Sequence, residues 1–229
     1  MSQTILGKTV IGPNIVTDNL LFYMDAGNVK SYPGTSDVIT DLSGNGYSIA
    51  LVTGTTYDSA DLGSFSFDGL DDYIQVSGDS YSFISGVTYE AFFNWDGSTR
   101  HGYAGLYVGN GRILINSAGR YLVQTNNGNF FSTEATGPIV ANEWSHLIYT
   151  FDLANEMEYI YHNSELVGSL ARTSQYDFPL NSFKIGWGSG GTTYYLYSGK
   201  ISINKVYARP FLPSEITQNY NAIRGRYKI

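Results

Sequence analysis

Short runs in which apolar and polar residues alternate recur along most of the chain, and turn-forming residues separate them. In the longest run, residues 87–95, every second residue is apolar. An alternation of period two is typical of a β-strand with one buried face, and a run of this length predicts a central strand.

The other runs are shorter and follow one another at similar spacing. Short strands with turns between them, such as Asp68-Gly69 and 109–111, predict an all-β sandwich or jelly roll. The further strands are expected at 18–24, 64–67, 73–76, 104–108, 112–115, 121–125, 145–152, 157–162, 183–187, 194–200 and 201–208.

A single helix is predicted near the end of the chain. Ile216, Tyr220 and Ile223 recur at helical spacing and share one face. Pro213 suits the first helical position, and Glu215 lies in the first turn, where negative charge favours the helix dipole. We expect this helix to pack its apolar face on the sandwich.

Without repeats or a low-complexity linker, the sequence predicts one domain. Residues 18–211 form the sandwich, and 212–229 form the helix and a tail. Residues 1–17 are broken by Gly7, Gly12 and Pro13, and they are interpreted as an arm that reaches a neighbour or as a frayed terminus.

Composition and charge restrict the classes of partner that this protein can bind. Charged residues make up 14% of the chain, against roughly 25% in soluble domains. The net charge of −7 makes nucleic acid a poor partner. A basic cluster, Arg224, Arg226 and Lys228, is too small for a duplex footprint and is interpreted as a contact tail or a solvated end.

The chain contains no cysteine, no sequon for N-glycosylation and no signal-like start, and its apolar runs fall short of the roughly 20 residues that span a bilayer. These features predict synthesis in a cytoplasm and no membrane insertion. The low charge is typical of proteins that work outside a cell or inside an assembly, and equally of β-rich proteins in general. Virion proteins, which are released by lysis, fit both the exterior composition and synthesis in a cytoplasm.

Four groups of segments occur in a characteristic order: 21–28 with 31–34 and 41–46, then 63–69 with 71–74, then 142–152 with 165–169, and finally 198–209 with 214–222. Together they resemble the laminin-G/pentraxin-like branch of the concanavalin A-like lectin and glucanase fold. The resemblance extends over residues 12–227 and implies a two-sheet antiparallel jelly-roll sandwich with one short C-terminal helix.

The segments 12–18 and 221–227 also resemble versions of this domain in structural proteins of tailed phages, especially marine phages and cyanophages. This resemblance implies a non-enzymatic protein of the virion surface: a capsid decoration, a knob or a fibre component made in the host cytoplasm. Its expected partners are other virion proteins, with a cell-surface glycan and self-association as further options. The alternative hypothesis is a lectin-like adhesin that recognises host carbohydrate.

Two loops supply candidate ligand contacts, because aromatic faces stack on sugars. One is the glycine-rich segment 186–192, which lacks the lysine and the following helix of a phosphate loop. The other is 95–101. The same rings equally suit the cover of a sheet face. The candidate rings are Trp95, Tyr103, Trp187, Tyr194, Tyr195 and Tyr197.

No cofactor is expected apart from a structural calcium ion, which this fold often holds with oxygen ligands. The resemblance implies Asp41 and Asn45 as ligands, with Asp71 and Asp72 as weaker ones. Relatives often carry an acid where this chain has Ser202, and its loss counts against the site.

The sequence offers little for catalysis, and no catalytic residue is assigned. Glucanases of this fold use a Glu-x-Asp-x-x-Glu strand, and residues 155–158 carry only Glu156 and Glu158, where a turn is expected. His101, His146 and His162 follow no metal or triad pattern. A glycoside hydrolase is therefore a remote third hypothesis.

Overall fold

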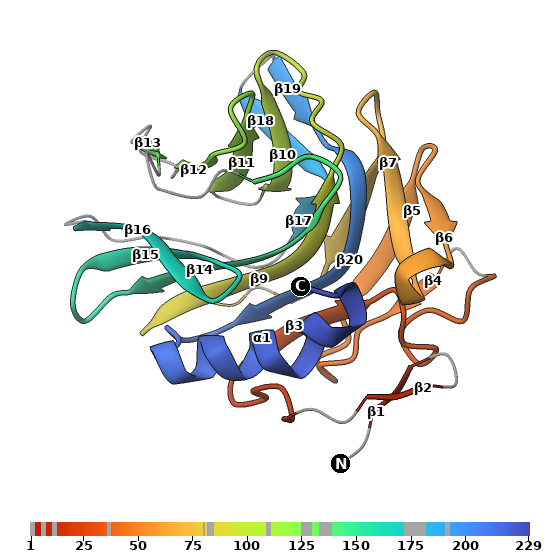
Figure 1. Cartoon of the computed structure of the whole chain (residues 1–229), viewed down its shortest axis with the longest axis horizontal. Helices are drawn as coiled ribbons and strands as arrows, with labels where there is room; N and C mark the ends of the chain where they lie inside the picture. The colour runs from red at the N-terminus through yellow and green to blue at the C-terminus, as the bar shows by residue number, and fades with distance from the viewer. Residues whose placement is uncertain are drawn as a thin grey trace.

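Two antiparallel β-sheets packed face to face form the body of the protein (Figure 1). The computed structural model describes residues 3–5, 8–10, 13–35, 38–79, 81, 85–108, 111–124, 130–132, 139–171, 182–190 and 193–229. Within these ranges each large sheet has eight strands, and one α-helix follows them. The fold class predicted from the sequence is confirmed.

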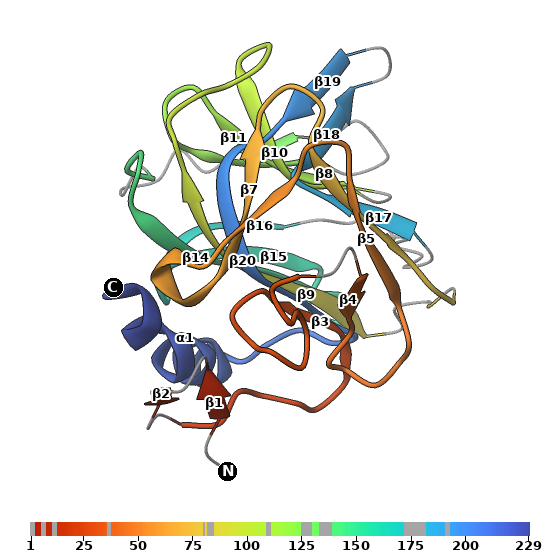
Figure 2. The ribbon, with the colours of Figure 1, turned by 90° about the vertical axis from the view of Figure 1, so that its right-hand side faces the viewer.

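One sheet carries the helix α1 (Pro213–Tyr227) on its outer face and is called the helix-side sheet (Figure 2). Its strand order is β16-β15-β14-β9-β20-β7-β6, and β3 also pairs with β20. The bounds are β3 Leu20–Asp25, β6 Thr56–Asp58, β7 Ser64–Asp68, β9 Gly86–Trp95, β14 Trp144–Asp152, β15 Met157–His162, β16 Glu165–Ala171 and β20 Ser198–Tyr207.

The other sheet is called the hairpin-side sheet, because the hairpin of β18 (Trp187–Gly190) and β19 (Thr193–Leu196) packs against β10 and β11. Its strand order is β13-β12-β11-β10-β17-β8-β5-β4. The bounds are β4 Val38–Thr40, β5 Ser48–Val52, β8 Tyr73–Ser77, β10 Tyr103–Val108, β11 Arg112–Asn116, β12 Tyr121–Gln124, β13 Phe130–Ser132 and β17 Ser182–Ile185.

Strand β20 organises the helix-side sheet and defines one rim of the sandwich. It pairs with β9 along one edge and, along the other edge, first with β7 and then with β3. Its first residue, Ser198, pairs with Asp68 at the end of β7, and Gly199 pairs with Trp95 at the end of β9. The turns that follow β7 and β9 therefore emerge at the same rim.

The core lies between the two sheets and is rich in aromatic rings. Phe22 of β3 meets Phe183 of β17 edge to face at 5.1 Å, which joins the sheets across the core. Such pairs add about 1 kcal/mol beyond the buried area. Phe93 and Tyr89 of the alternating run 87–95 also face this core, as predicted.

Several strands escaped the sequence analysis. Most of β16 is exposed, and β4 and β6 have only three residues each, so their runs carry little alternation. The predicted strand 194–200 is divided at Tyr197 into β19 and β20, and 183–187 is divided at Gly186, which has a φ of +79°. Predictions for 109–110, 125 and 191–192 fall outside the described residues.

The helix α1 was expected from Ile216, Tyr220 and Ile223. Ile216 and Ile223 are buried, while Tyr220 is half-buried and stacks beside His146 at 5.6 Å. Glu215 accepts a hydrogen bond from the backbone N–H of Leu212 at 2.9 Å, which caps the first turn. The helix is too short and polar to cross a membrane, and no other helix in the described ranges could do so.

Polar groups hold the middle of α1 on the sheet. The carboxylate of Glu90 accepts hydrogen bonds from Lys205 at 3.0 Å and Asn219 at 2.7 Å, and it lies 3.1 Å from His146 Nε2. Burial alone would raise the pKa of Glu90, but the Lys205 ammonium and the His146 ring outweigh it and lower that pKa to about 2. The charged side chains therefore compensate one another inside the protein.

A second buried ion pair anchors the end of the helix. Arg226 Nη1 donates to Asp25 at 2.7 Å, and its Nη2 donates to Ser202 at 2.9 Å and to the carbonyl of Leu62 at 3.0 Å. Of the C-terminal basic cluster, Arg226 thus points inward, while Arg224 and Lys228 are exposed. The interpretation of that cluster as a tail or a solvated end is corrected for Arg226.

The N-terminal segment divides into two parts. The strands β1 (Gln3–Ile5) and β2 (Lys8–Val10) pair only with each other among the described residues. Ile15 and Val16 are buried beside α1, and the N–H of Val16 donates to Asn219 at 2.7 Å. Residues 13–16 therefore belong to the packed body.

Candidate functional site

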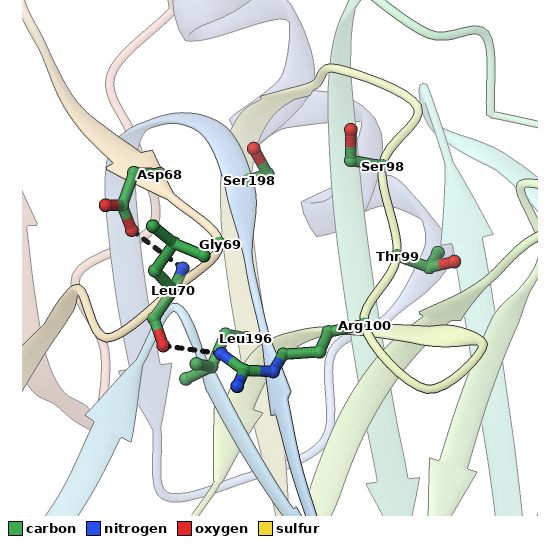
Figure 3. Close-up of a pocket in the computed structure, with 8 residues that line it drawn as sticks. All are labelled: Asp68, Gly69, Leu70, Ser98, Thr99, Arg100, Leu196 and Ser198. Atoms are coloured by element: carbon green, nitrogen blue, oxygen red, sulfur yellow. Dashed lines mark hydrogen bonds between the residues drawn. The ribbon is translucent and has the colours of Figure 1, made fainter.

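A pocket of about 290 Å³ opens at the rim where β7, β9, β19 and β20 end or begin (Figure 3). Three segments of the chain supply its walls: the turn after β7, the loop after β9, and the step from β19 to β20. The lining residues are Asp68, Gly69, Leu70, Ser98, Thr99, Arg100, Leu196 and Ser198.

The first wall is the Asp68-Gly69 turn. Asp68 accepts a hydrogen bond from the N–H of Leu70 at 2.7 Å, and Gly69 has a φ of +75°, a conformation that glycine adopts without strain. Arg100 donates from the opposite wall to the carbonyl of Leu70 at 2.7 Å (Figure 3). This bond ties the two walls together.

The second wall is the loop 96–101, which hydrogen bonds hold rigidly. Asp96 accepts from the N–H of Ser98 at 2.7 Å and from the hydroxyl of Ser198 at 2.6 Å. The indole N–H of Trp95 donates to the carbonyl of Ser98 at 2.7 Å. The backbone of this loop is therefore fixed, while the side chains of Ser98 and Arg100 remain exposed.

Negative charge predominates around the pocket. Carboxylate oxygens of Asp68, Asp71 and Asp72 lie within 4.8 Å of one another, and Arg100 is the cation among the lining residues. Asp72 is buried and accepts backbone hydrogen bonds from Gly54 and Asp68. Burial raises the pKa of Asp72, and the neighbouring carboxylates act in the same direction.

The expected calcium ligands fall into two separate places. Asp41 uses its oxygens to accept backbone N–H groups of Tyr23 and Ser43, and Asn45 turns its NH₂ group toward the carbonyl of Leu21. This arrangement stabilises the loop and leaves Asn45 with a donor where an ion needs an oxygen, so the pair does not fit calcium. Asp71 and Asp72 lie with Asp68, so calcium remains a prediction for that carboxylate group alone.

Four of the six predicted ligand-contact rings gather around the β18–β19 hairpin. The ring of Tyr195 lies 5.1 Å from that of Tyr103, and Trp187 lies 5.0 Å from Tyr194. Trp187 also contacts Tyr73 at 4.8 Å, a ring that the sequence analysis did not select. All five side chains are at least partly exposed, and Leu196 links them to the pocket because it pairs with Trp187.

The other two rings lie in the core. Tyr197 is fully buried between Phe67 and Phe93, and burial raises the pKa of its hydroxyl. Trp95 is 3% exposed. Both side chains are buried in the core, so the structure favours packing over ligand contact for them.

None of the remaining chemical candidates is among the lining residues, although His101 ends the loop 96–101 beside Arg100. Glu156 is exposed in the turn between β14 and β15, and Glu158 is buried and accepts a hydrogen bond from Tyr149 at 2.9 Å. His101 is exposed, His146 lies under α1, and His162 meets the hydroxyl of Tyr121 at 2.8 Å. The two glutamates therefore do not form a carboxylate pair facing a cleft.

Sequence reasoning missed Ser198 and Leu196 as lining residues, and it assigned Asp68 only to a turn. The available signal was local: glycines follow Asp68 and Ser198, and Gly199 has a φ of +131°. Their convergence depends on β20 pairing with both β7 and β9, which no local pattern shows.

Several solved structures share this fold. The binding domain of botulinum neurotoxin serotype D aligns with 91% of this chain and 53% of its own length, at 11% identity and a TM-score of 0.68. The binding domain of Paraclostridial Mosquitocidal Protein 1 aligns with 90% of this chain and 52% of its own, at 18% identity and 0.68. The binding domain of botulinum neurotoxin serotype G aligns with 88% of this chain and 50% of its own length, at 14% identity and a TM-score of 0.65. This chain thus spans about half the length of these domains.

No curated protein matches the sequence. A sequence profile of the concanavalin A-like lectin/glucanases superfamily, Laminin_G_3, matches residues 67–217. This span includes the pocket turn, the hairpin and most of both sheets. The chain therefore belongs to the concanavalin A-like lectin/glucanases superfamily.

Proposed function

We propose that this protein is a non-enzymatic recognition module that binds carbohydrate at the rim pocket. The observation that carries the proposal is a preformed pocket with hydroxyl, carboxylate and guanidinium groups on its walls and partly exposed aromatic rings beside it. Sugars present hydroxyl groups and apolar C–H faces, and such a combination recognises both.

The rigidity of the walls favours this function. Asp96 and Trp95 fix the loop 96–101, and Arg100 links it to Leu70. A pocket held in its binding shape loses little conformational entropy when a ligand enters. The three solved structures reported above are described as binding domains, and a further structure of this fold, from botulinum neurotoxin C/D mosaic serotype, is described as a receptor binding domain. These descriptions support recognition of a cell-surface molecule.

A glycan-binding screen with the full chain tests the proposal. We expect binding to neutral or amino sugars, because the carboxylates of Asp68 in the lining and of Asp71 and Asp72 beside it outnumber the single guanidinium of Arg100. Arg100→Ala and Asp68→Asn should each weaken binding by about tenfold, the effect of losing one hydrogen bond to a charged group. The asparagine side chain retains an oxygen that can accept the N–H of Leu70, so the Asp68→Asn variant should fold normally.

Arg224→Ala is the matched control, because Arg224 is an exposed arginine on α1 outside the pocket lining. Its affinity should equal that of the wild type. Binding that survives both pocket variants unchanged, or a wild type that binds no glycan, would overturn the proposal.

We further propose that the module acts on the virion surface of a tailed phage, as a decoration, knob or fibre component. The resemblance of 12–18 and 221–227 to phage structural proteins supports this role. The β1–β2 hairpin supports it as well, because it pairs with no other described strand and is suited to contact another virion protein.

Immunogold electron microscopy of the presumed phage particles tests the location. Label on the head would support a decoration protein, and label on a tail or fibre would support an adhesin. Intact particles without label would refute the virion role. Deletion of residues 1–12 tests the arm, since it spares the buried Ile15 and Val16; attachment that survives this deletion would exclude the arm as the docking element.

A further inference from the structure

The rim end of the hairpin-side sheet and the outer face of the same sheet differ in charge. Carboxylates gather at the rim end of β8, where Asp68, Asp71 and Asp72 lie together. The outer face of the same sheet carries none of the described carboxylates, although the whole chain has a net charge of −7. This face therefore differs in charge from the rim pocket beside it.

The strand register shows which residues form this face. Ala50 pairs with Gln75, Gln75 with Lys184, and Arg112 with Gln124. Val108 of β10 pairs with Lys184 on one side and with Arg112 on the other. These paired residues therefore form one continuous row across the sheet. Because directly paired residues share a face, the four polar side chains point away from the core. A second row adds hydroxyl groups: Thr40, Ser48, Ser77 and Ser182.

Lys184 is the best-placed cation of this face. Its ammonium lies 4.1 Å from the ring centre of Tyr73 and 4.2 Å from that of Trp187. Among the described residues no carboxylate pairs with it, and partial burial lowers its pKa. The two rings hold the charge by cation–π attraction and keep it in place without neutralising it.

The β18–β19 hairpin forms a wall along this row. Tyr194 packs on Trp187, and Arg112 lies over the ring of Tyr195 at 5.2 Å. From the usual strand spacing, Lys184 and Arg112 are about 10 Å apart along the row. The face thus carries the Lys184 ammonium beside partly exposed rings and a row of hydroxyl groups, with the Arg112 guanidinium further along the same row.

We propose that this outer face binds a polysaccharide of uronic acids, with Lys184 as the principal contact. A uronic acid carries its carboxylate on the sugar ring. One residue can therefore bring its carboxylate to the Lys184 ammonium while its ring packs on Tyr194, the exposed ring beside Trp187. The surface extends the proposed carbohydrate recognition to a second, anionic class of glycan and is separate from the rim pocket.

Binding of the full chain to oligomers of polygalacturonate, measured by calorimetry, tests this inference. The neutral galactose oligomer is the comparison ligand because it lacks only the carboxylates. We expect polygalacturonate to bind and the neutral oligomer to bind at least about tenfold more weakly. Higher ionic strength should weaken the polygalacturonate complex.

Lys184→Gln keeps most of the side-chain length and removes the charge, so it should reduce polygalacturonate affinity on the order of tenfold. Lys30→Gln is the matched control, since Lys30 is an exposed lysine outside both sheets, and its affinity should not change. A thermal melt of each variant checks that the fold is intact. Equal affinity of Lys184→Gln and wild type would refute the inference, as would equal binding of the neutral oligomer.

The pocket variant separates this inference from the proposed function. Arg100→Ala should leave polygalacturonate binding intact, while Lys184→Gln should leave binding of a neutral or amino sugar intact. Loss of polygalacturonate binding in Arg100→Ala would place the anionic ligand in the pocket and overturn the assignment to the sheet face. Binding of dextran sulfate without binding of polygalacturonate would also overturn it.

Discussion

At Asp41, four hydrogen bonds converge on one side chain. Its carboxylate accepts from the N–H groups of Tyr23, Ser43 and Tyr47 and from the hydroxyl of Ser43. These bonds join β3 to the loop that leads into β5. A residue that resemblance implied as a calcium ligand is instead a structural acceptor.

Replacement of Asp41 by alanine should therefore cost stability whether or not calcium is present. The variant leaves backbone N–H groups in a mostly buried place without an acceptor, which costs about 2–4 kcal/mol. Urea denaturation in calcium and in EDTA would measure it. A cost that appears only in calcium would show that Asp41 does bind the ion.

Aromatic residues show the limit of reasoning from single positions. Tyr197 and Tyr195 are two residues apart in the same segment, yet Tyr197 is fully buried and Tyr195 is partly exposed. In an unbroken strand two residues at this spacing would share a face. Here the chain leaves β19 at Leu196 and begins β20 at Ser198, so the two rings lie in different surroundings. The sequence therefore predicted aromatic side chains at the rim of the sandwich, but it could not show which of them are accessible to a ligand.

The helix α1 illustrates how an element depends on polar partners. Apolar periodicity predicted it, but Asn219 and Arg226 on its buried face belong to no apolar pattern. Both can be buried because carboxylates on the sheet accept their hydrogen bonds: Glu90 accepts from Asn219, and Asp25 accepts from Arg226. Pairs between residues so far apart in the sequence cannot be predicted from local sequence patterns.

Arg226→Ala should destabilise the protein by about 3–5 kcal/mol, because it leaves the carboxylate of Asp25 buried without its partner. The double variant Asp25→Ala with Arg226→Ala should cost less than the sum of the single variants. Chemical denaturation of the four proteins gives the coupling energy. Additive costs would mean that the ion pair does not couple the helix to the sheet.

The hairpin β18–β19 depends on a glycine beneath it. A Cβ atom on Gly105 would overlap the backbone of Gly188 and the carbonyl of Tyr195. Gly105→Val should therefore displace the hairpin, abolish polygalacturonate binding and shift the fluorescence of Trp187. Gly225→Ala on α1, where a Cβ meets open space, is the control and should change neither signal.

The elements that the sequence predicted best are the long central ones. Strands β9 and β14 have enough residues for the alternation to stand out, and they confirm the predicted runs. The run 201–208 lies almost wholly in β20, but that strand begins earlier, at Ser198, inside the other predicted run 194–200. The pocket required more than these runs. Its two loops were recognised separately as turns, but their meeting follows from the strand order around β20.

For the whole molecule, buried ionisable groups predict how stability depends on pH. Burial lowers the pKa of His146, and burial lowers that of His162 to about 4. In the unfolded chain both titrate near about 6.5. As the pH falls below that value the unfolded state binds protons first, so stability is lost between about 6.5 and 4.

We expect the free energy of unfolding to be level above neutral pH and to fall by up to about 3 kcal/mol for His162 through this window. Glu90 adds a further loss of stability at lower pH. Its pKa is about 4.5 in the unfolded chain and about 2 in the folded protein, so this loss falls between those two pH values. Denaturation at several pH values would show it. His162→Gln should flatten the first slope, whereas His101→Gln, an exposed control, should leave it unchanged.

The position of β20 in the chain has a consequence for synthesis on the ribosome. This strand pairs with β3, β7 and β9, all of which leave the ribosome long before it. Until residues 198–207 emerge, the edges of those strands expose backbone N–H and C=O groups without their pairing partner, and distant pairings of this kind form slowly. The helix-side sheet is therefore expected to be completed only after β20 has been translated, and the nascent chain is expected to need protection from aggregation until then.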